Sequence, residues 1–206
     1  MNVMEKRIYL ASRSPRRREL LKQIGINFEM LIMRTYPIVR ADVDETPRPG
    51  ESPADYVTRI AMNKATTGWT RAMERRLPRW PVLGADTTVA IDGETVGKPS
   101  NAEDAANMLR KLSGREHEVF SAVAVALNEH VETKLSRSRV RFSELSDSLI
   151  QDYVDSGEPM DKAGAYGVQG KAAVFIAEIN GSYSGIMGLP LYETAQLLKQ
   201  AGLPVL

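Results

Sequence analysis

The segment Leu10-Ala11-Ser12-Arg13-Ser14-Pro15-Arg16-Arg17-Arg18-Glu19-Leu20-Leu21 joins a short apolar run to a helical pattern. Residues 7–11 predict a strand, Ser14 is a favourable helix N-cap, and Pro15 occupies the first helical position, where proline is preferred. Apolar side chains further along give the helix one buried stripe, made of Leu20, Leu21 and Ile24. A strand that leads directly into a helix favours an α/β fold.

The first turn of this helix is unusual because it carries Arg16, Arg17 and Arg18. The positive end of the helix dipole disfavours each of these cations by roughly 0.3–1 kcal/mol. A bound anion would offset this cost, since free N–H groups, the Ser12 hydroxyl and guanidinium groups all suit phosphate oxygens. The alternative is a solvated basic turn with Glu19 as counter-ion, which fits Arg18 better than Arg17, because Arg17 borders the inward face.

The composition limits the classes of function. The chain has 206 residues with 27 basic and 26 acidic side chains, so it lacks the broad positive field of most nucleic-acid binders, and we expect no nucleic-acid partner. Its length suits one α/β domain spanning 1–206. The absence of cysteine excludes disulfides, zinc–thiolate sites and cysteine nucleophiles. Because no apolar run approaches the ~20 residues that span a bilayer, we expect a soluble cytoplasmic protein without a membrane partner.

Periodicity and breaker residues predict the remaining elements. Strands are expected at 28–33, 81–91, 94–96, 116–127, 131–142 and 173–179, and helices at 52–73, 101–112, 147–156 and from about 190 to 200. The run 116–127 is apolar on both faces, which predicts a central strand. The next run places Arg137, Arg139 and Arg141 on one face, which indicates a solvated sheet face. His117 and His130 have no partner spacing and are expected to be ordinary histidines.

Residues 34–51 contain prolines and glycine without periodicity, and therefore predict a loop. Its acidic segment, Asp42-Val43-Asp44-Glu45, can hold Mg²⁺ through oxygen ligands, although an acidic surface loop is an equal alternative. Lys64 follows Ile60 by one helical turn on the apolar stripe of the next helix. Its ammonium group either faces a cleft or extends along the surface to water.

Asp86 is the strongest single candidate for chemistry. It interrupts an apolar strand after Gly84-Ala85, and burying a carboxylate costs several kcal/mol unless it is paired, metal-bound or chemically employed. The alternative is a hydrogen-bonded structural aspartate at a bulge. The glycine-rich segment 161–170 indicates close backbone approach, but it lacks the P-loop spacing, and 181–185 lacks the central serine of a nucleophile elbow.

Taken in order, these segments resemble the Maf family of nucleoside triphosphate pyrophosphatases, once described as septum-formation inhibitors. The matching segments span almost the whole chain: 12–17, Asp44-Glu45, 59–65, 84–88, Gly97-Lys98-Pro99, 161–170 and Gly188-Leu189-Pro190. The resemblance implies hydrolysis of a nucleoside triphosphate to the monophosphate and pyrophosphate with Mg²⁺ or Mn²⁺. It also implies an elongated two-lobed α/β fold, with a twisted mixed sheet flanked by helices as in inosine triphosphatase, and usually a homodimer.

The resemblance also assigns roles to individual residues. Asp86 matches the base that activates water. Asp86 and Glu45 also match the positions of the metal ligands. The positions that match phosphate- and substrate-binding residues are Ser12, Arg17, Lys64, Lys98, Asp161 and Lys162. The positions that match the branch acting on dTTP and UTP are Arg16, Thr87 and Gln169. A glutamine amide both donates and accepts, as the edge of uracil or thymine requires, whereas the carboxylate of the 7-methyl-GTP branch only accepts.

Two alternatives to a dTTP/UTP pyrophosphatase stay open at this point. One is a pyrophosphatase for 7-methyl-GTP or another modified nucleotide. The 7-methyl-GTP branch carries other residues than this chain at the three specificity positions. The other is a non-enzymatic nucleotide-binding regulator of cell division. Metal-dependent turnover separates the enzyme hypotheses from the regulator.

Overall fold

The computed structural model describes residues 7–32, 42–203 and 205. Within these ranges, seven strands form one mixed sheet in the order β2-β1-β3-β5-β6-β7, with β4 paired to β3. The first strand pairs in parallel with its two neighbours, and the other pairs are antiparallel. The strand bounds are β1 Arg7–Leu10, β2 Asn27–Met30, β3 Val82–Ile91, β4 Glu94–Val96, β5 Glu116–Leu127, β6 His130–Phe142 and β7 Ile176–Asn180.

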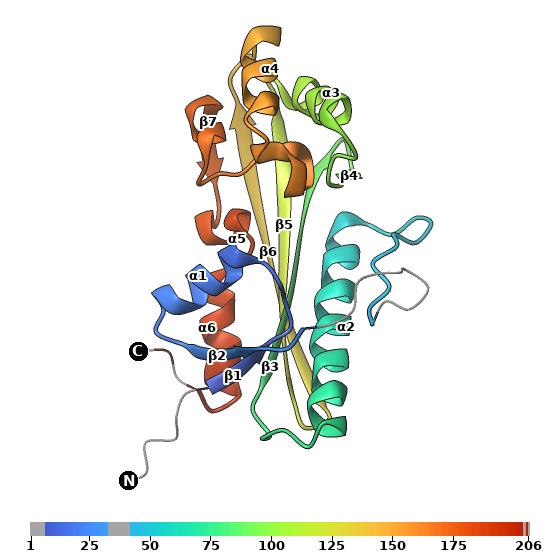
Figure 1. Ribbon diagram of the computed structural model, residues 1–206, viewed down its shortest axis with the longest axis vertical. Coiled ribbons are helices and arrows are strands. Elements are labelled where there is room, and N and C mark those ends of the chain that lie inside the picture. The colour runs from blue at the N-terminus through green and yellow to red at the C-terminus, as the bar shows by residue number, and fades with distance from the viewer. Residues whose placement is uncertain (1–6, 33–41, 204, 206) are drawn as a thin grey trace.

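Helices cover the sheet differently at its two ends (Figure 1). Their bounds are α1 Pro15–Gln23, α2 Pro53–Glu74, α3 Ala102–Leu112, α4 Asp147–Asp155, α5 Tyr183–Met187 and α6 Leu191–Gln200, with 3₁₀ turns η2 Glu158–Asp161, η3 Ala163–Ala165 and η4 Lys171–Phe175. We call the end that carries α1, α2 and α6 the lower lobe, and the end that carries α3, α4 and β7 the upper lobe. The long strands β3, β5 and β6 run through both, so the predicted elongated two-lobed α/β fold is confirmed.

The core follows from the two-sided apolar pattern of β5. In the lower lobe, Ala122 and Ala124 pack on the side of α2, while Val123 and Val125 pack with residues of α1 and α6 on the other side. A separate cluster joins α3 and α4 to the sheet in the upper lobe. The prediction that 116–127 is a central strand is therefore correct, and the two lobes have distinct cores.

The helix starts are capped as the sequence predicts. The Ser14 hydroxyl accepts a hydrogen bond from the Arg17 N–H at 3.5 Å, and the Ser52 hydroxyl accepts one from the Asp55 N–H at 3.1 Å. Each cap is followed by a proline at the start of its helix. The caps therefore fix where α1, which carries Arg17, and α2, which carries Lys64, begin.

The predicted strand at 173–179 is wrong in its first half. Residues Lys171–Phe175 form η4, and β7 begins only at Ile176. The buried residues Ala172 and Phe175 are three positions apart, while Val174 is 80% exposed, so the apolar run has the period of a 3₁₀ turn and not of a strand.

Two other boundaries differ from the prediction. The second strand ends at Met30, and the predicted residue 33, with positions 34–41 of the predicted loop, lies outside the described residues. Helix α5 was not predicted, although Ser182 caps it by accepting a hydrogen bond from the Gly185 N–H. Of the helices that the structure describes, none combines the length and apolar character needed to cross a membrane.

Candidate active site

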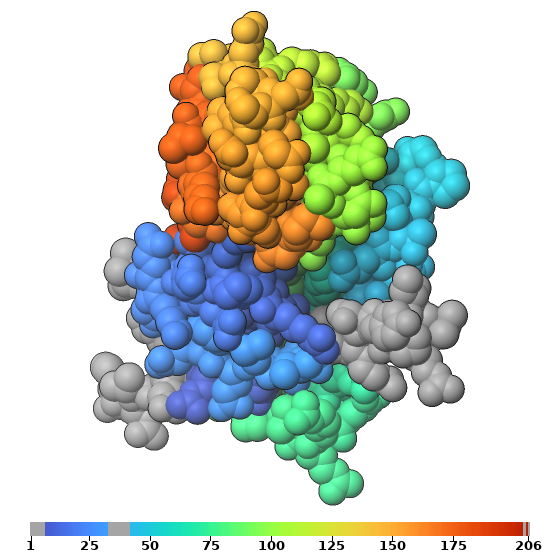
Figure 2. Space-filling model, turned by 45° about the horizontal axis from the view of Figure 1, so that its top comes forward, coloured from blue at the N-terminus to red at the C-terminus, as the bar shows by residue number. Residues whose placement is uncertain are grey.

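A cleft of about 920 Å³ lies where the upper lobe meets the N-terminal segment and α2. Figure 2 shows the surface hollowed between the orange and green upper lobe and the blue N-terminal segment. The predicted site residues that line it are Ser12, Arg16, Arg17, Glu45, Lys64, Asp86, Thr87, Lys98, Asp161 and Lys162. Residues far apart in the sequence thus converge on one site from both lobes.

Arg17 lies in the floor of this cleft at the start of α1. Its side chain is buried, with Nε donating to the Gly188 carbonyl at 2.8 Å and Nη1 donating to the Ser12 hydroxyl at 3.2 Å. Burial lowers the pKa of the Arg17 guanidinium, while the charges of Asp86 and Glu45 oppose that shift. The solvated-turn alternative is therefore wrong for Arg17, whereas Arg18 points elsewhere, with Nη1 3.9 Å from the Met30 sulfur.

Lys64 connects Glu45 and Asp86, the two carboxylates that the sequence indicated as candidates. Its Nζ lies 2.8 Å from Asp86 Oδ1 and 3.1 Å from Glu45 Oε1, and its side chain is 13% exposed. The ammonium group therefore faces the cleft and does not extend to water. Glu45 comes from the acidic segment, Lys64 from α2 and Asp86 from β3, so the three groups meet through the tertiary fold.

The strand around Asp86 is regular. The pairing of β3 with β5 continues without a register shift from Val82 to Ala90. This pair therefore has no bulge at Asp86, where the alternative of a structural aspartate expected one. A Cβ at Gly84 would lie 2.5 Å from the Ala61 carbonyl oxygen, which means that α2 packs directly on the strand backbone there. This close approach brings Lys64 within reach of Asp86.

The upper lobe contributes a charged group around Asp161. Lys162 Nζ lies 2.6 Å from the Asp161 carboxylate, and Arg16 from α1 lies 3.5 Å from the same oxygen. Partial burial opposes ionisation, but the Lys162 hydrogen bond and the Arg16 charge together hold the pKa of Asp161 below its usual value. Arg16 and Asp161 thereby link the lobes across the cleft, and Lys98 lies exposed on its lining.

Thr87 and Gln169 differ in where they lie. The Thr87 hydroxyl is 2.8 Å from that of Ser121 and 3.4 Å from the Gly188 carbonyl oxygen, so it supports the backbone to which Arg17 binds. Gln169 is exposed and does not line the cleft, although its neighbour Val168 does. The Gln169 Oε1 would lie 3.6 Å, and Lys162 Cε 2.8 Å, from a Cβ added at Gly167, so Gln169 lies near Lys162 but outside the cleft lining.

Several residues of the site were not singled out from the sequence. Tyr56 and Tyr166 line the cleft, and Ser121 donates to the Gly185 carbonyl at 2.6 Å behind Thr87. Tyr166 adds an apolar wall together with Val89, Val119, Val168 and Ile186. The Ser52-Pro53 cap places Tyr56 at the start of α2. This cap is the one feature of the sequence that indicated where Tyr56 lies.

A second hollow, of about 390 Å³, is lined by Arg137, Arg139 and Asn180. Arg137 pairs with Glu118, and Arg139 lies 3.6 Å from Glu116, so these guanidinium charges are balanced. The predicted solvated sheet face is confirmed, and none of the predicted site residues lines this second hollow.

The residues present suit a divalent cation that arrives with a phosphate ligand. The described residues contain no cluster of three or more histidine, cysteine, aspartate or glutamate side chains able to hold a metal ion by themselves. Glu45 and Asp86 nevertheless converge on one cation, the Lys64 ammonium group. Mg²⁺ is commonly held by one or two carboxylates together with substrate phosphates, which is the donor set that this cleft would provide.

Comparisons with known proteins show which proteins the chain resembles. A family model described as "Maf-like protein" matches residues 7–201. The dTTP/UTP pyrophosphatase of Aromatoleum aromaticum is 56% identical over 206 residues, covering 100% of both chains, and that of Nitrosomonas europaea is 56% identical over 96% of both. The structure of the Staphylococcus aureus Ham1 protein gives a TM-score of 0.41 at 18% identity, over 69% of this chain and 73% of that one.

Proposed function

The chain belongs to the Maf family, and we propose that it is a nucleoside triphosphate pyrophosphatase that converts dTTP and UTP to the monophosphate and pyrophosphate. The observation that carries the proposal is the meeting of Asp86, Lys64 and Glu45 in a cleft whose floor holds the buried Arg17. A desolvated guanidinium beside paired carboxylates suits a phosphate ligand and a proton acceptor at once. The relatives named dTTP/UTP pyrophosphatase support the choice of substrate.

In this proposal the triphosphate binds across the cationic side of the cleft. Arg17 and the N-terminal turn of α1 hold phosphate oxygens from the lower lobe, and Lys98 and Lys162 approach from the upper lobe. Together these groups neutralise the charge that develops on the leaving pyrophosphate. Glu45 and Asp86 would hold a divalent cation, Mg²⁺ or Mn²⁺, which when bound supplies further positive charge against the phosphate oxygens.

Asp86 is the proposed general base. Lys64 donates to its Oδ1, and among the described residues no group donates to Oδ2, which can therefore take a proton from water. The water oxygen then bonds to the α-phosphorus while the bond from that phosphorus to the bridging oxygen breaks, and pyrophosphate leaves with the electron pair. The Asp86 side chain is only 12% exposed, so few other waters compete for this position.

The proposed preference for pyrimidines rests on Arg16, Thr87 and Gln169. Thr87 shapes the backbone at Gly188, Arg16 lines the cleft beside Asp161, and Gln169 follows Val168 of the apolar wall. We place the Gln169 amide at the rim, where it donates to and accepts from the base edge. A homodimer, implied by the family resemblance, and a cytoplasmic location, expected from the lack of a bilayer-spanning apolar run, are further proposals that light scattering and cell fractionation test.

The test is pyrophosphate release with Mg²⁺ or Mn²⁺ across dTTP, UTP, CTP, GTP and 7-methyl-GTP. We expect preference for dTTP and UTP, and loss of turnover in Asp86→Asn with unchanged thermal unfolding. The matched control is Asp92→Asn, since Asp92 is an exposed carboxylate that pairs with Arg115 just beyond the same strand. Preference for 7-methyl-GTP would refute the pyrimidine specificity assigned to Arg16, Thr87 and Gln169. Turnover by Asp86→Asn would show that Asp86 is not the general base.

A further inference from the structure

The acidic segment that carries Glu45 is fastened to α2 by Arg59. Its Nε and Nη2 lie 2.5 and 2.7 Å from the two carboxylate oxygens of Glu51, and the two side chains are only 13% and 9% exposed. The hydrogen bonds from Arg59 lower the pKa of Glu51 to about 2, so the pair stays charged at neutral pH. A shielded bidentate pair of this kind fixes orientation as well as position.

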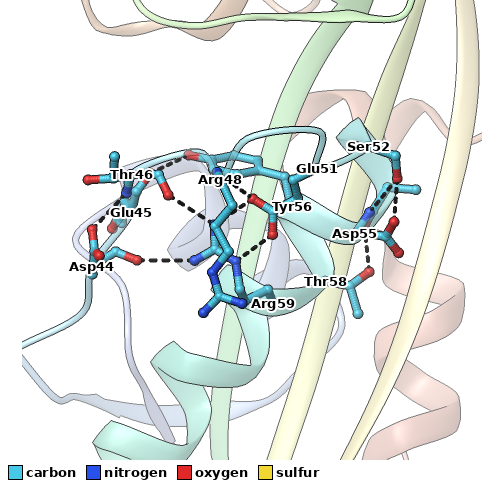
Figure 3. Close-up of polar contacts among 11 residues, drawn as sticks. Asp44, Glu45, Thr46, Arg48, Glu51, Ser52, Asp55, Tyr56, Thr58 and Arg59 are labelled. Carbon is cyan, nitrogen blue, oxygen red and sulfur yellow. Dashed lines mark hydrogen bonds and ion pairs between the residues drawn. The ribbon is translucent and has the colours of Figure 1, made fainter.

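The same guanidinium also binds the backbone on both sides of Glu45 (Figure 3). It donates to the carbonyl oxygens of Asp44 at 3.4 Å and Thr46 at 3.0 Å. The Tyr56 hydroxyl donates to the carbonyl of Glu45 itself at 3.0 Å, and the Arg59 guanidinium lies 5.6 Å from the Tyr56 ring. Three consecutive carbonyl groups are therefore held by two side chains from neighbouring turns of one helix.

The carboxylate of Glu45 has little else to fix it. Residues 44–48 form no helix or strand, and the Glu45 side chain is 47% exposed. Its ion pair with Lys64 connects it to Asp86, but an exposed ion pair by itself barely offsets the entropy of ordering a loop. The backbone contacts from α2 supply the missing constraint, and α2 also supplies Lys64.

We propose that Arg59, assisted by Tyr56, is a positioning residue that holds the backbone of Glu45 so that its carboxylate meets Lys64 and Asp86. Arg59 does not itself line the cleft, so it acts through Glu45. The kinetic part of the inference rests on the proposed pyrophosphatase function. Lysine cannot replace arginine here, because an ammonium group lacks the planar fork that reaches both Glu51 oxygens and two carbonyls together.

A double-mutant cycle tests whether Arg59 acts through Glu45. We expect Arg59→Lys to lower kcat/KM by roughly 10- to 100-fold, as small misplacements of catalytic groups do. Glu45→Gln should lower it at least as much, and adding Arg59→Lys to Glu45→Gln should change it less than about twofold, because the group being positioned is gone. Multiplicative losses, or full activity in Arg59→Lys, would overturn the proposal.

Controls separate positioning from a general loss of structure. Arg75→Lys makes the same chemical change at the exposed C-terminal end of α2 and should keep wild-type kinetics. Tyr56→Phe removes only the hydroxyl that binds the Glu45 carbonyl and serves as the second variant if Arg59→Lys unfolds. We expect it to lower kcat/KM severalfold on its own and, like Arg59→Lys, to have little effect in the Glu45→Gln background; a multiplicative loss there would also overturn the proposal.

Spin labels give a readout that does not depend on turnover. The chain has no cysteine, so Arg48→Cys and Glu74→Cys accept labels selectively at two exposed positions. Arg48 lies beside the Glu51–Arg59 pair, and α2 rises 1.5 Å per residue from Arg59 to Glu74, so the labels are separated by roughly 20 Å or more, a range that electron–electron double resonance measures well. We expect one narrow distance distribution in wild type and Arg75→Lys and a broad one in Arg59→Lys. An unchanged distribution would overturn the inference, whereas a wild type without turnover but with the narrow distribution would refute only the proposed function.

Discussion

His117 shows how a single buried residue ties stability to pH. Its ring is 2% exposed, packs edge-on against Phe142 and Tyr166, and places Nε2 2.8 Å from the Tyr166 hydroxyl, while Nδ1 is buried without a hydrogen-bond partner among the described residues. Burial lowers the pKa of His117 from its ordinary 6.5 to about 4. The unfolded chain therefore binds this proton at a higher pH than the folded protein does.

The sign of the effect follows directly. As pH falls from about 6.5 to about 4, only the unfolded state gains the proton on His117, and folding loses on the order of 3 kcal/mol. Urea unfolding across this range should show a loss that is larger in wild type than in His117→Gln by this amount, because carboxylates such as Glu51 titrate alike in both. The matched control, His130→Gln, alters an exposed histidine beside Glu132 and should keep the wild-type slope. An unchanged slope in His117→Gln would contradict the prediction.

At the residue scale, the sequence identified the groups whose placement depends on local pattern. Arg17 borders the inward face of a capped helix, and Asp86 interrupts an apolar strand, so both were identified before any tertiary contact was known. Arg59 and Ser121 act through contacts to segments that their own local patterns do not indicate, and they were not identified. Gln169 was expected at the site from family resemblance, but it lies exposed outside the cleft lining.

At the element scale, the packing of α2 on β3 places Lys64 beside Asp86. Gly84 permits this contact, because an added Cβ would meet the Ala61 carbonyl oxygen at 2.5 Å and the Ala65 nitrogen at 2.6 Å, both backbone atoms that cannot turn aside. We expect Gly84→Ala to destabilise the fold by roughly 1–3 kcal/mol and to separate Lys64 from Asp86. Chemical denaturation measures the first effect and nucleotide turnover the second.

The control for this prediction is Gly97→Ala, where the added Cβ meets nothing within 4 Å. It should leave the free energy of unfolding within about 0.5 kcal/mol of wild type. If Gly84→Ala were as stable as this control and as active as wild type, the close approach of α2 would not be what fixes Lys64.

The elements themselves were predictable wherever pattern and capping agree. Helix α2 and the long strands β3, β5 and β6 have both strong periodicity and clear breakers at their ends, and they were predicted nearly to the residue. Helix α5 and turn η4 are too short for periodicity to identify, and packing decides them: Phe175 enters the upper core while Val174 points outward. Short elements of this kind depend on tertiary contacts more than on their own sequence.

At the scale of the whole molecule, the cleft is a joint between two lobes with separate cores. Its lining alternates between the lower lobe, with α1 and Asp86, and the upper lobe, with Lys98 and residues 161–168. The direct side-chain pair between α1 and η2, Arg16 with Asp161, is partly exposed and contributes little by itself. A triphosphate that contacts both linings would therefore add to the connection that the continuous strands β3, β5 and β6 already make between the lobes.

This arrangement predicts what nucleotide binding does to the whole chain. A dTTP analogue with a non-hydrolysable imido bridge between its α and β phosphates, at 100 times its Kd, should stabilise the fold by about 2.7 kcal/mol. For a chain of this length that corresponds to a rise in Tm of about 5–10 °C. Amide hydrogen exchange should slow together in the first turn of α1 and in residues 161–168, because one ligand contacts both. Protection confined to one lobe would show that the nucleotide occupies only half of the cleft, and the proposed contacts of the other half would then have to be withdrawn.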